Sequence, residues 1–214
     1  MSTVRVRQHV NPLSRKHQRT VAPPHWPNIY TNPTAPLHLD IGSAHGQFLF
    51  QIASQHPEWN FLGIEIREPL VYQALEKRDE LGLSNLYFMT CNANTTLGPL
   101  LASLPNQVLQ RVSIFFPDPW FKRRHHKRRV VQPQLVTDLA RVMPPHATIF
   151  LQSDIEALAL SMCEQFQAHS AFTRTVNHWL SENPIGVSTE REEMTLEKGE
   201  PVYRAMFIRN PATP

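Results

Sequence analysis

Hydrophobic and polar positions alternate between residues 37 and 209 with two periods, one typical of strands and one typical of helices. Short apolar runs bounded by glycine or polar residues predict strands, and apolar residues three and four positions apart predict helices between them. The predicted strands cover 37–41, 60–66, 86–89, 111–116, 147–151, 172–178 and 202–208. The predicted helices cover 45–55, 68–81, 95–104, 132–142 and 154–167, and residues 181–200 are expected to be irregular and acidic.

The alternation of strands and helices predicts an α/β fold built on a doubly wound, mostly parallel sheet. The 214 residues suit one domain with an appendage, and we expect the domain over 37–210. Residues 1–36 are expected to form an extended basic N-terminal arm, because six prolines there oppose an amphipathic targeting helix. Open sheets of this kind bind ligands beyond the carboxyl ends of their strands, so functional residues are sought there.

Basic residues are concentrated in two segments of a chain whose formal net charge is only +3. Residues 1–39 hold five Lys or Arg and no acid, and residues 122–129 hold six Lys or Arg. The remainder of the chain is therefore acidic, and this distribution indicates a polyanionic partner. A solvated cationic loop is the plainer interpretation of the second segment.

Several classes of protein are not expected from this composition. No run of about 18 apolar residues exists that could span a membrane. Cys91 and Cys163 have neither a pairing nor a zinc spacing, so two buried thiols in a reducing cytoplasm are expected. The eleven histidines show no ligand spacing, and no metal is expected.

Polar residues that suit a nucleoside ligand follow the first three predicted strands. Asp40 precedes a turn with Gly42 and Gly46, where an acid would repel a pyrophosphate and suit a cationic ligand with sugar hydroxyls. Glu65 ends the second strand, where a carboxylate can accept hydrogen bonds from both ribose hydroxyls. Asn92 follows the third strand and could read an adenine edge, although a turn asparagine is the default interpretation.

The fourth predicted strand ends in Phe-Phe-Pro-Asp-Pro-Trp-Phe-Lys over residues 115–122 and runs directly into the basic segment. Six cations beside a candidate ligand site are costly without a counterion, and the phosphates of a folded RNA would supply one. Trp120 and Phe121 have two interpretations, packing on the sheet or stacking on an extruded base.

These features together resemble known methyltransferases. An acid before a G-x-x-x-G turn and an acid ending the second strand resemble the Rossmann-like S-adenosylmethionine-dependent class. Residues 116–129 closely resemble the F-P-D-P-W-x-K-x-x-H-x-K-R-R hallmark of the tRNA (guanine-N7-)-methyltransferases, with His125 at its histidine. Asp154, the T-x-x-E of residues 189–192 and the G-x-P-x-Y-R of residues 199–204 match the same family.

The resemblance implies a Rossmann-like methyltransferase fold with a seven-stranded sheet whose last strand is antiparallel. It implies S-adenosylmethionine as the cofactor, methyl transfer to N7 of the variable-loop guanosine 46 of tRNA, and a cytoplasmic location. It also implies that Asp118 is catalytic and contacts the cofactor. The other cofactor-binding positions are Asp40, Gly42, Glu65 and Asn92, and the substrate-binding positions are Lys122, Asp154, Thr189, Glu190, Arg191 and Glu192.

The chain departs from the pattern of that family at three positions, and other functions stay open. Asp40 stands where the family often has Glu, Ala44 where it has a glycine, and Asn92 where it has an acid, which bears on cofactor affinity. One alternative is an amine-directed RNA or small-molecule methyltransferase, because Asp-Pro-Trp is similar to the Asp-Pro-Pro-Tyr loop of such enzymes. Another is a non-catalytic tRNA-binding protein, and either a monomer or a homodimer is compatible with the sequence.

Overall fold

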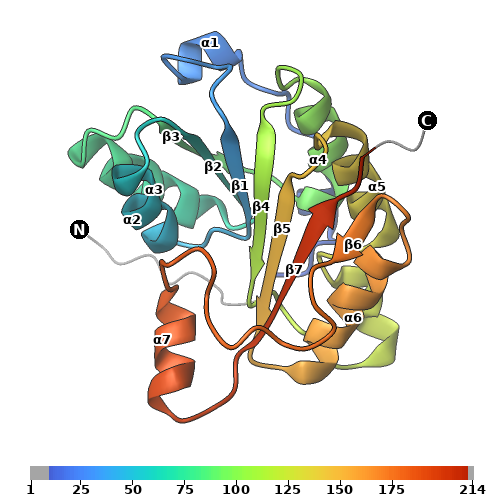
Figure 1. Ribbon diagram of the computed structural model, residues 1–214. Helices are drawn as coiled ribbons and strands as arrows, with labels where there is room; N and C mark the ends of the chain where they lie inside the picture. The colour runs from blue at the N-terminus through green and yellow to red at the C-terminus, as the bar shows by residue number, and fades with distance from the viewer. Residues whose placement is uncertain (1–9, 212–214) are drawn as a thin grey trace.

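Residues 10–211 are described by the computed structural model, in which seven strands form one sheet in the order β3-β2-β1-β4-β5-β7-β6 (Figure 1). The strands are β1 (Leu37–Ile41), β2 (Asn60–Glu65), β3 (Leu86–Thr90), β4 (Leu109–Phe115), β5 (Thr148–Ser153), β6 (Phe172–Arg174) and β7 (Tyr203–Arg209). The first five strands pair in parallel, whereas β7 runs antiparallel to both β5 and β6. The expected sheet with an antiparallel last strand is therefore confirmed.

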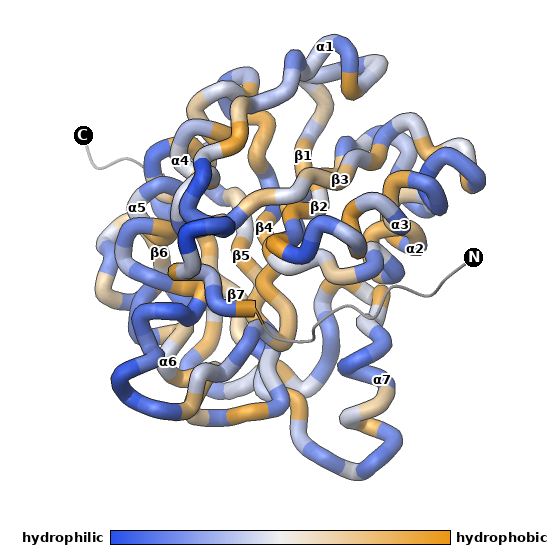
Figure 2. The backbone as a smooth tube through the Cα atoms, turned by 180° about the vertical axis from the view of Figure 1, so that it is seen from behind, coloured by the Kyte–Doolittle hydropathy of each residue, from blue (hydrophilic) through white to orange (hydrophobic). Residues whose placement is uncertain are grey.

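Helices cover both faces of the sheet. One face carries α2 (Gln47–Gln55) and α3 (Glu68–Glu80), and the other carries α4 (Ala93–Ala102), α5 (Pro133–Val142) and α6 (Glu156–Gln167) (Figure 1). Each face has its own cluster of buried hydrophobic residues, and Figure 2 shows the hydrophobic stretches concentrated in the strands between them. Shorter helices are η1 (Arg15–Gln18), α1 (Trp26–Ile29), η2 (Arg123–Arg128) and α7 (Glu190–Glu197), of which η1 and η2 are 3-10 helices.

Helices on both faces bury β1 and β2 completely, including the polar residues His38 and Asp40 of β1. Every residue of β1 and β2 is buried, which is typical of parallel strands covered by helices on both sides. Gly63 lies in the middle of β2, where an added Cβ would come within 2.8 Å of the Leu49 side chain and within 2.6 Å of the Phe88 ring. The glycine therefore lets α2 and β3 pack closely against this strand.

The acidic segment before the last strand contains a helix that hydrophobic periodicity does not reveal. The expectation that residues 181–200 are irregular is wrong over α7, whose sequence EREEMTLE carries few apolar residues. Thr189 caps this helix, because its hydroxyl oxygen accepts a hydrogen bond from the backbone N–H of Glu192 at 3.1 Å. Figure 1 shows α7 beyond the carboxyl ends of the parallel strands, where a ligand site is expected.

Within the arm expected over residues 1–36, Pro12, Trp26 and Tyr30 are buried against the domain, whereas residues 18–22 are exposed. Trp26 of α1 is 4% exposed, and its indole Nε1 donates a hydrogen bond to Ser103 Oγ at 3.0 Å. Residues 1–9 of the expected arm lie outside the described residues. The basic side chains at positions 15, 16 and 19 are exposed on this packed segment.

Three expectations from the composition concern membrane spans, metal sites and cysteines, and the structure of residues 10–211 bears on each. In that range, no helix is both long and apolar enough to cross a membrane. The same residues contain no group of three or more His, Cys, Asp or Glu side chains placed to hold a metal ion. Cys91 and Cys163 are buried and free of disulfides, and burial raises the pKa of the Cys91 thiol to about 12.

Candidate active site

Two adjoining cavities open at the carboxyl edge of the sheet, where the loops that follow the parallel strands meet. The first cavity, of about 150 Å³, is lined by Glu65 and Asn92 among others. The second cavity, of about 450 Å³, is lined by Asp40 and Asp154 among others. Asp118 lines both cavities, so the structure brings the acids that follow four different strands into one cleft.

The glycine turn after β1 contributes Gly42 to the lining of both cavities and Ala44 to that of the second. Gly42, Ala44 and Gly46 all have positive φ, of 91°, 47° and 80°. The backbone N–H of Gly42 donates to the carbonyl of Ile64 at 2.8 Å, which ties the turn to the end of β2. A left-handed backbone costs an alanine about 1–2 kcal/mol, so the departure from the family pattern at Ala44 places strain in this turn.

Glu65 is fixed at the end of β2 by four hydrogen bonds and is 3% exposed. Its Oε1 accepts from the backbone N–H and Nε of Arg67, at 2.9 and 3.0 Å. Its Oε2 accepts from Arg67 Nη2 at 2.9 Å and from the backbone N–H of Ala44 at 3.1 Å. The carboxylate therefore stands where the sequence predicts it, but its pairing with Arg67 was not foreseen.

Asn92 caps α4 and also anchors the N-terminal segment beside the first cavity. Its Oδ1 accepts from the backbone N–H of Asn94 at 3.1 Å. Its Nδ2 donates to the carbonyls of Pro12 and His17, both at 3.0 Å. Because both amide hydrogens are used in this way, Oδ1 is the atom that remains to contact an adenine amine.

The loop after β4 holds Asp118 between two prolines in a strained backbone. Phe116 and Trp120 have φ values of 45° and 43°, a region that bulky residues rarely adopt and that is often found at functional sites. The backbone N–H of Phe116 donates to the carbonyl of Gln152 at 2.8 Å, which ties this loop to β5. The charge of Asp118 also interacts with that of Arg67 across the first cavity.

The basic segment after β4 divides into cations that contact the protein and cations that face solvent. Arg128 lies over the ring of Trp120, 4.8 Å from its centroid. Arg129 donates to the carbonyl of Pro119 and to Ser161 Oγ, at 2.9 and 3.1 Å. The exposed cations are Lys122, Arg123, Arg124 and Lys127. These four, rather than all six, are available to the phosphates of a nucleic acid.

The two aromatic residues of this loop have different environments. Trp120 is partly buried between Arg128 and His125, whose ring centroid lies 5.9 Å away, and it lines the first cavity, so it packs on the basic segment rather than on the sheet. Phe121 is 73% exposed and lines the second cavity. An exposed ring at the mouth of a cavity fits the stacking interpretation.

Four of the predicted substrate-binding residues meet at the second cavity. Thr189, Glu190 and Arg191 line it from the start of α7, and Asp154 lines it from the end of β5. Arg191 Nε donates to Asp154 Oδ2 at 3.0 Å, and Arg191 Nη2 donates to the same oxygen. Lys122, by contrast, is exposed and is not among the lining residues of either cavity.

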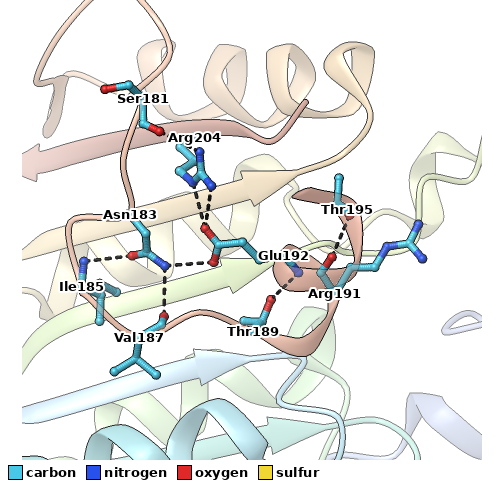
Figure 3. A network of polar contacts seen from close by, with 9 residues as sticks. All are labelled: Ser181, Asn183, Ile185, Val187, Thr189, Arg191, Glu192, Thr195 and Arg204. Carbon is cyan, nitrogen blue, oxygen red and sulfur yellow. Dashed lines mark hydrogen bonds and ion pairs between the residues drawn. The ribbon is translucent and has the colours of Figure 1, made fainter. Parts of the chain in front are cut away.

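Glu192 does not lie with these residues. It is 1% exposed, and its Oε1 accepts from Arg204 Nε and Nη2 at 3.0 and 2.7 Å. Its Oε2 accepts from Asn183 Nδ2 at 2.9 Å, and Figure 3 shows Glu192 and Arg191 pointing to opposite sides of α7. Both carboxylate oxygens accept hydrogen bonds from other residues of the protein, and Glu192 is not among the residues that line the two cavities.

The sequence of this chain is similar to those of characterised families over most of its length. Residues 34–205 match the family model described as a putative methyltransferase. A tRNA (guanine-N(7)-)-methyltransferase of Trichormus variabilis is 57% identical over 96% of both chains. The chain belongs to the tRNA (guanine-N(7)-)-methyltransferase family. The protein of the same name from Synechococcus elongatus is also 57% identical, over 99% of this chain and 100% of its own.

Solved structures with little sequence similarity share the fold of this family member. The 16S rRNA methyltransferase KamB superposes with a TM-score of 0.59 at 13% identity, covering 86% of this chain and 90% of its own. A SAM-dependent methyltransferase from Aquifex aeolicus gives a TM-score of 0.56 at 13% identity, covering 81% and 82%. These likenesses show the Rossmann-like methyltransferase fold.

Proposed function

We propose that this protein transfers a methyl group from S-adenosylmethionine to N7 of a guanosine in tRNA, at the variable-loop position 46 that the resemblance implies. The observation that carries the proposal is the place of Asp118, which lines both cavities of the cleft. The first cavity would hold the adenosine part of the cofactor, and the second would hold its methionine part and the guanine. The activity named for the similar cyanobacterial proteins supports the same reaction.

The residues of the cleft fit the chemical groups of S-adenosylmethionine. The Glu65 carboxylate at the end of β2 suits the two ribose hydroxyls, and Asn92 Oδ1 suits the adenine amine. The Asp40 carboxylate suits the ammonium group of the methionine part. Gly42 has open space where a Cβ would stand, so a ligand can approach the backbone closely. When bound, the cofactor supplies a methyl group already activated by its positively charged sulfur.

The protein's part in the reaction is alignment and charge stabilisation. Guanine N7 carries a lone pair and no proton, so it needs no general base. The guanine ring becomes positively charged as it accepts the methyl group, and the Asp118 carboxylate stabilises that charge. The N1–H and N2–H groups of guanine donate hydrogen bonds, and Asp154, held by Arg191, offers an acceptor at the second cavity.

Identification of the methylated nucleoside tests this proposal against its alternatives. Mass spectrometry of nucleosides from tRNA incubated with the protein and S-adenosylmethionine is expected to find 7-methylguanosine. A methyl group on an exocyclic amine would instead favour the amine-directed enzyme, which the Asp-Pro-Trp sequence also suggests. Retention of tRNA with neither product nor cofactor binding would identify a non-catalytic tRNA-binding protein.

Replacing Glu65 by Gln is expected to weaken cofactor binding by about 1.5–3 kcal/mol, roughly ten- to a hundredfold in Kd, because a charged acceptor is lost. Calorimetric titration with S-adenosylmethionine measures the change. Glu68→Gln is the matched control, since Glu68 is exposed at the start of α3 and bonds to Tyr72. Unchanged cofactor affinity together with weaker tRNA binding would contradict the assignment of Glu65 to the ribose.

Replacing Arg123, Arg124 and Lys127 together by Ala is expected to reduce the salt dependence of tRNA binding. Three exposed cations that contact phosphates release bound counterions, so the slope of log K against log salt should shrink by about two. Filter binding over a salt series measures the slope, with Lys77→Ala on α3 as a control cation that should not change it. An unchanged slope in the triple variant would mean that these side chains do not meet RNA.

A further inference from the structure

Two buried hydrogen bonds connect His38 of β1, through Ser113 of β4, to Asp40 of β1 at the second cavity. His38 Nε2 lies 2.9 Å from Ser113 Oγ, and Ser113 Oγ donates to Asp40 Oδ1 at 2.6 Å. His38 and Ser113 are fully buried, and Asp40 is 4% exposed. Neither His38 nor Ser113 is among the residues that line the two cavities, whereas Asp40 lines the second.

When Asp40 is ionised, the number of hydrogens on each group determines which group donates in each of these hydrogen bonds. The Ser113 hydroxyl has one hydrogen, which it donates to Asp40, so it must accept from His38. The proton of the neutral imidazole therefore lies on Nε2. Burial lowers the pKa of His38 well below its usual value, and the charge of Arg111 acts in the same direction. His38 is therefore held in its neutral form, and it donates to Ser113 when Asp40 is ionised.

Asp40 stands in surroundings that disfavour its negative charge. Its pKa is raised to about 7, chiefly by burial and to a smaller extent by the charge of Glu65, against the hydrogen bond from Ser113, which lowers it. Without that bond, the Asp40 carboxyl would be protonated over more of the neutral range. The other titratable or charged residues that line the same cavity are His45, Arg67, Asp118, Asp154, Glu190 and Arg191.

We propose that His38 and Ser113 are positioning residues that hold Asp40 ionised and directed at the ammonium group of the cofactor. The inference rests on the proposed function, in which Asp40 contacts that group. His38 fixes the Ser113 hydroxyl, and Ser113 fixes one oxygen of Asp40, so the second oxygen keeps a constant orientation. Two residues without contact to the ligand thereby determine how tightly it binds near neutral pH.

The pH dependence of cofactor affinity tests this inference on the full chain. The carboxylate attracts the ammonium group only when ionised, so affinity for S-adenosylmethionine should be full above the pKa of Asp40 and fall below it. Ser113→Ala removes a donor that lowers this pKa, so the acidic limb of the affinity curve should move to higher pH by about one unit. Calorimetric titrations between about pH 5.5 and 8.5 would reveal the shift.

Variants of His38 give an independent measurement. His38→Leu should move the acidic limb in the same direction by a smaller amount, because Ser113 loses the donor that orients it. His38→Gln keeps an N–H donor at a similar reach and should return the limb toward that of the unchanged protein. If Ser113→Ala does not fold, this pair decides the question. Equal curves for His38→Leu and the unchanged protein would exclude a role for His38.

Ser103→Ala is the matched control, because it removes a serine hydroxyl that accepts from Trp26 and lies just past the end of α4. It should leave the acidic limb in place.

A Ser113→Ala curve that coincides with that of the unchanged protein would overturn the inference. Asp40→Asn separates this failure from that of the proposed function. If Asp40→Asn weakens cofactor binding, the proposed contact between Asp40 and the ammonium group survives. If it does not, that contact and the positioning role of His38 and Ser113 are both excluded.

Discussion

Replacing Asp118 by Asn is expected to slow methyl transfer by about 10²–10³-fold, the usual cost of losing one preorganised electrostatic group. The asparagine keeps the size and some hydrogen bonding of the aspartate but removes the negative charge beside the guanine. Asp118 lines both cavities, so the loss falls between the sites proposed for the cofactor and the guanine. Single-turnover methylation of a tRNA transcript at saturating cofactor measures the rate of this step.

The same substitution at an exposed aspartate separates catalysis from folding. Asp79→Asn on α3 removes a carboxylate that pairs with Arg78 at the surface, and it should leave the rate unchanged. Melting temperatures of both variants should stay near that of the unchanged protein. A normal single-turnover rate in Asp118→Asn would remove Asp118 from the mechanism. A slow rate with a collapsed melting temperature would indicate a structural aspartate in the loop after β4.

Glu192→Ala is expected to destabilise the protein by about 3–5 kcal/mol, because it leaves the Arg204 guanidinium buried without its partner. For a chain of this length, such a loss lowers the melting temperature by on the order of 10 °C. Differential scanning calorimetry measures both quantities. The buried network of Figure 3 also includes Asn183, whose Nδ2 loses an acceptor in the variant.

Glu193→Ala provides the comparison, because Glu193 is the next residue on α7 and is exposed. It should change the melting temperature little. The outcome also distinguishes two roles for Glu192. If Glu192→Ala melts like Glu193→Ala but methylates tRNA slowly, the residue acts on substrate as the sequence motif implies. If it melts early, the T-x-x-E motif combines a helix cap at Thr189 with a buried ion pair.

Much of the cleft could be predicted because the order of strands and helices along the sequence determines where its residues lie. Strands and helices alternate with clear periods, and parallel strands place their carboxyl ends at one edge of a sheet. Asp40, Glu65 and Asp118 follow three different strands, so the topology alone brings them together. Each lies where its position relative to its strand indicated, which is why a motif could locate the site without coordinates.

The contacts that were missed join residues whose proximity no local pattern encodes. Asn92 holds the carbonyl of Pro12 across 80 positions of sequence, and this bond makes the N-terminal segment a wall of the first cavity. Arg128 and Arg129 belong to a run of six cations, and nothing in that run shows which of them turn inward. Helix α7 was missed for another reason, since its cap and polar surface carry no apolar period.

The place of β7 in the sheet constrains the order in which the fold can be completed. β7 lies between β5 and β6, although both of these strands precede it in the sequence. A growing chain therefore leaves one edge of β5 unpaired, and gives β6 no partner in the sheet, until Arg209 has been synthesised. Unpaired strand edges invite pairing with other chains. A chain that stops short of this strand would hold every residue that lines the two cavities, yet its sheet would be open to pairing with other chains.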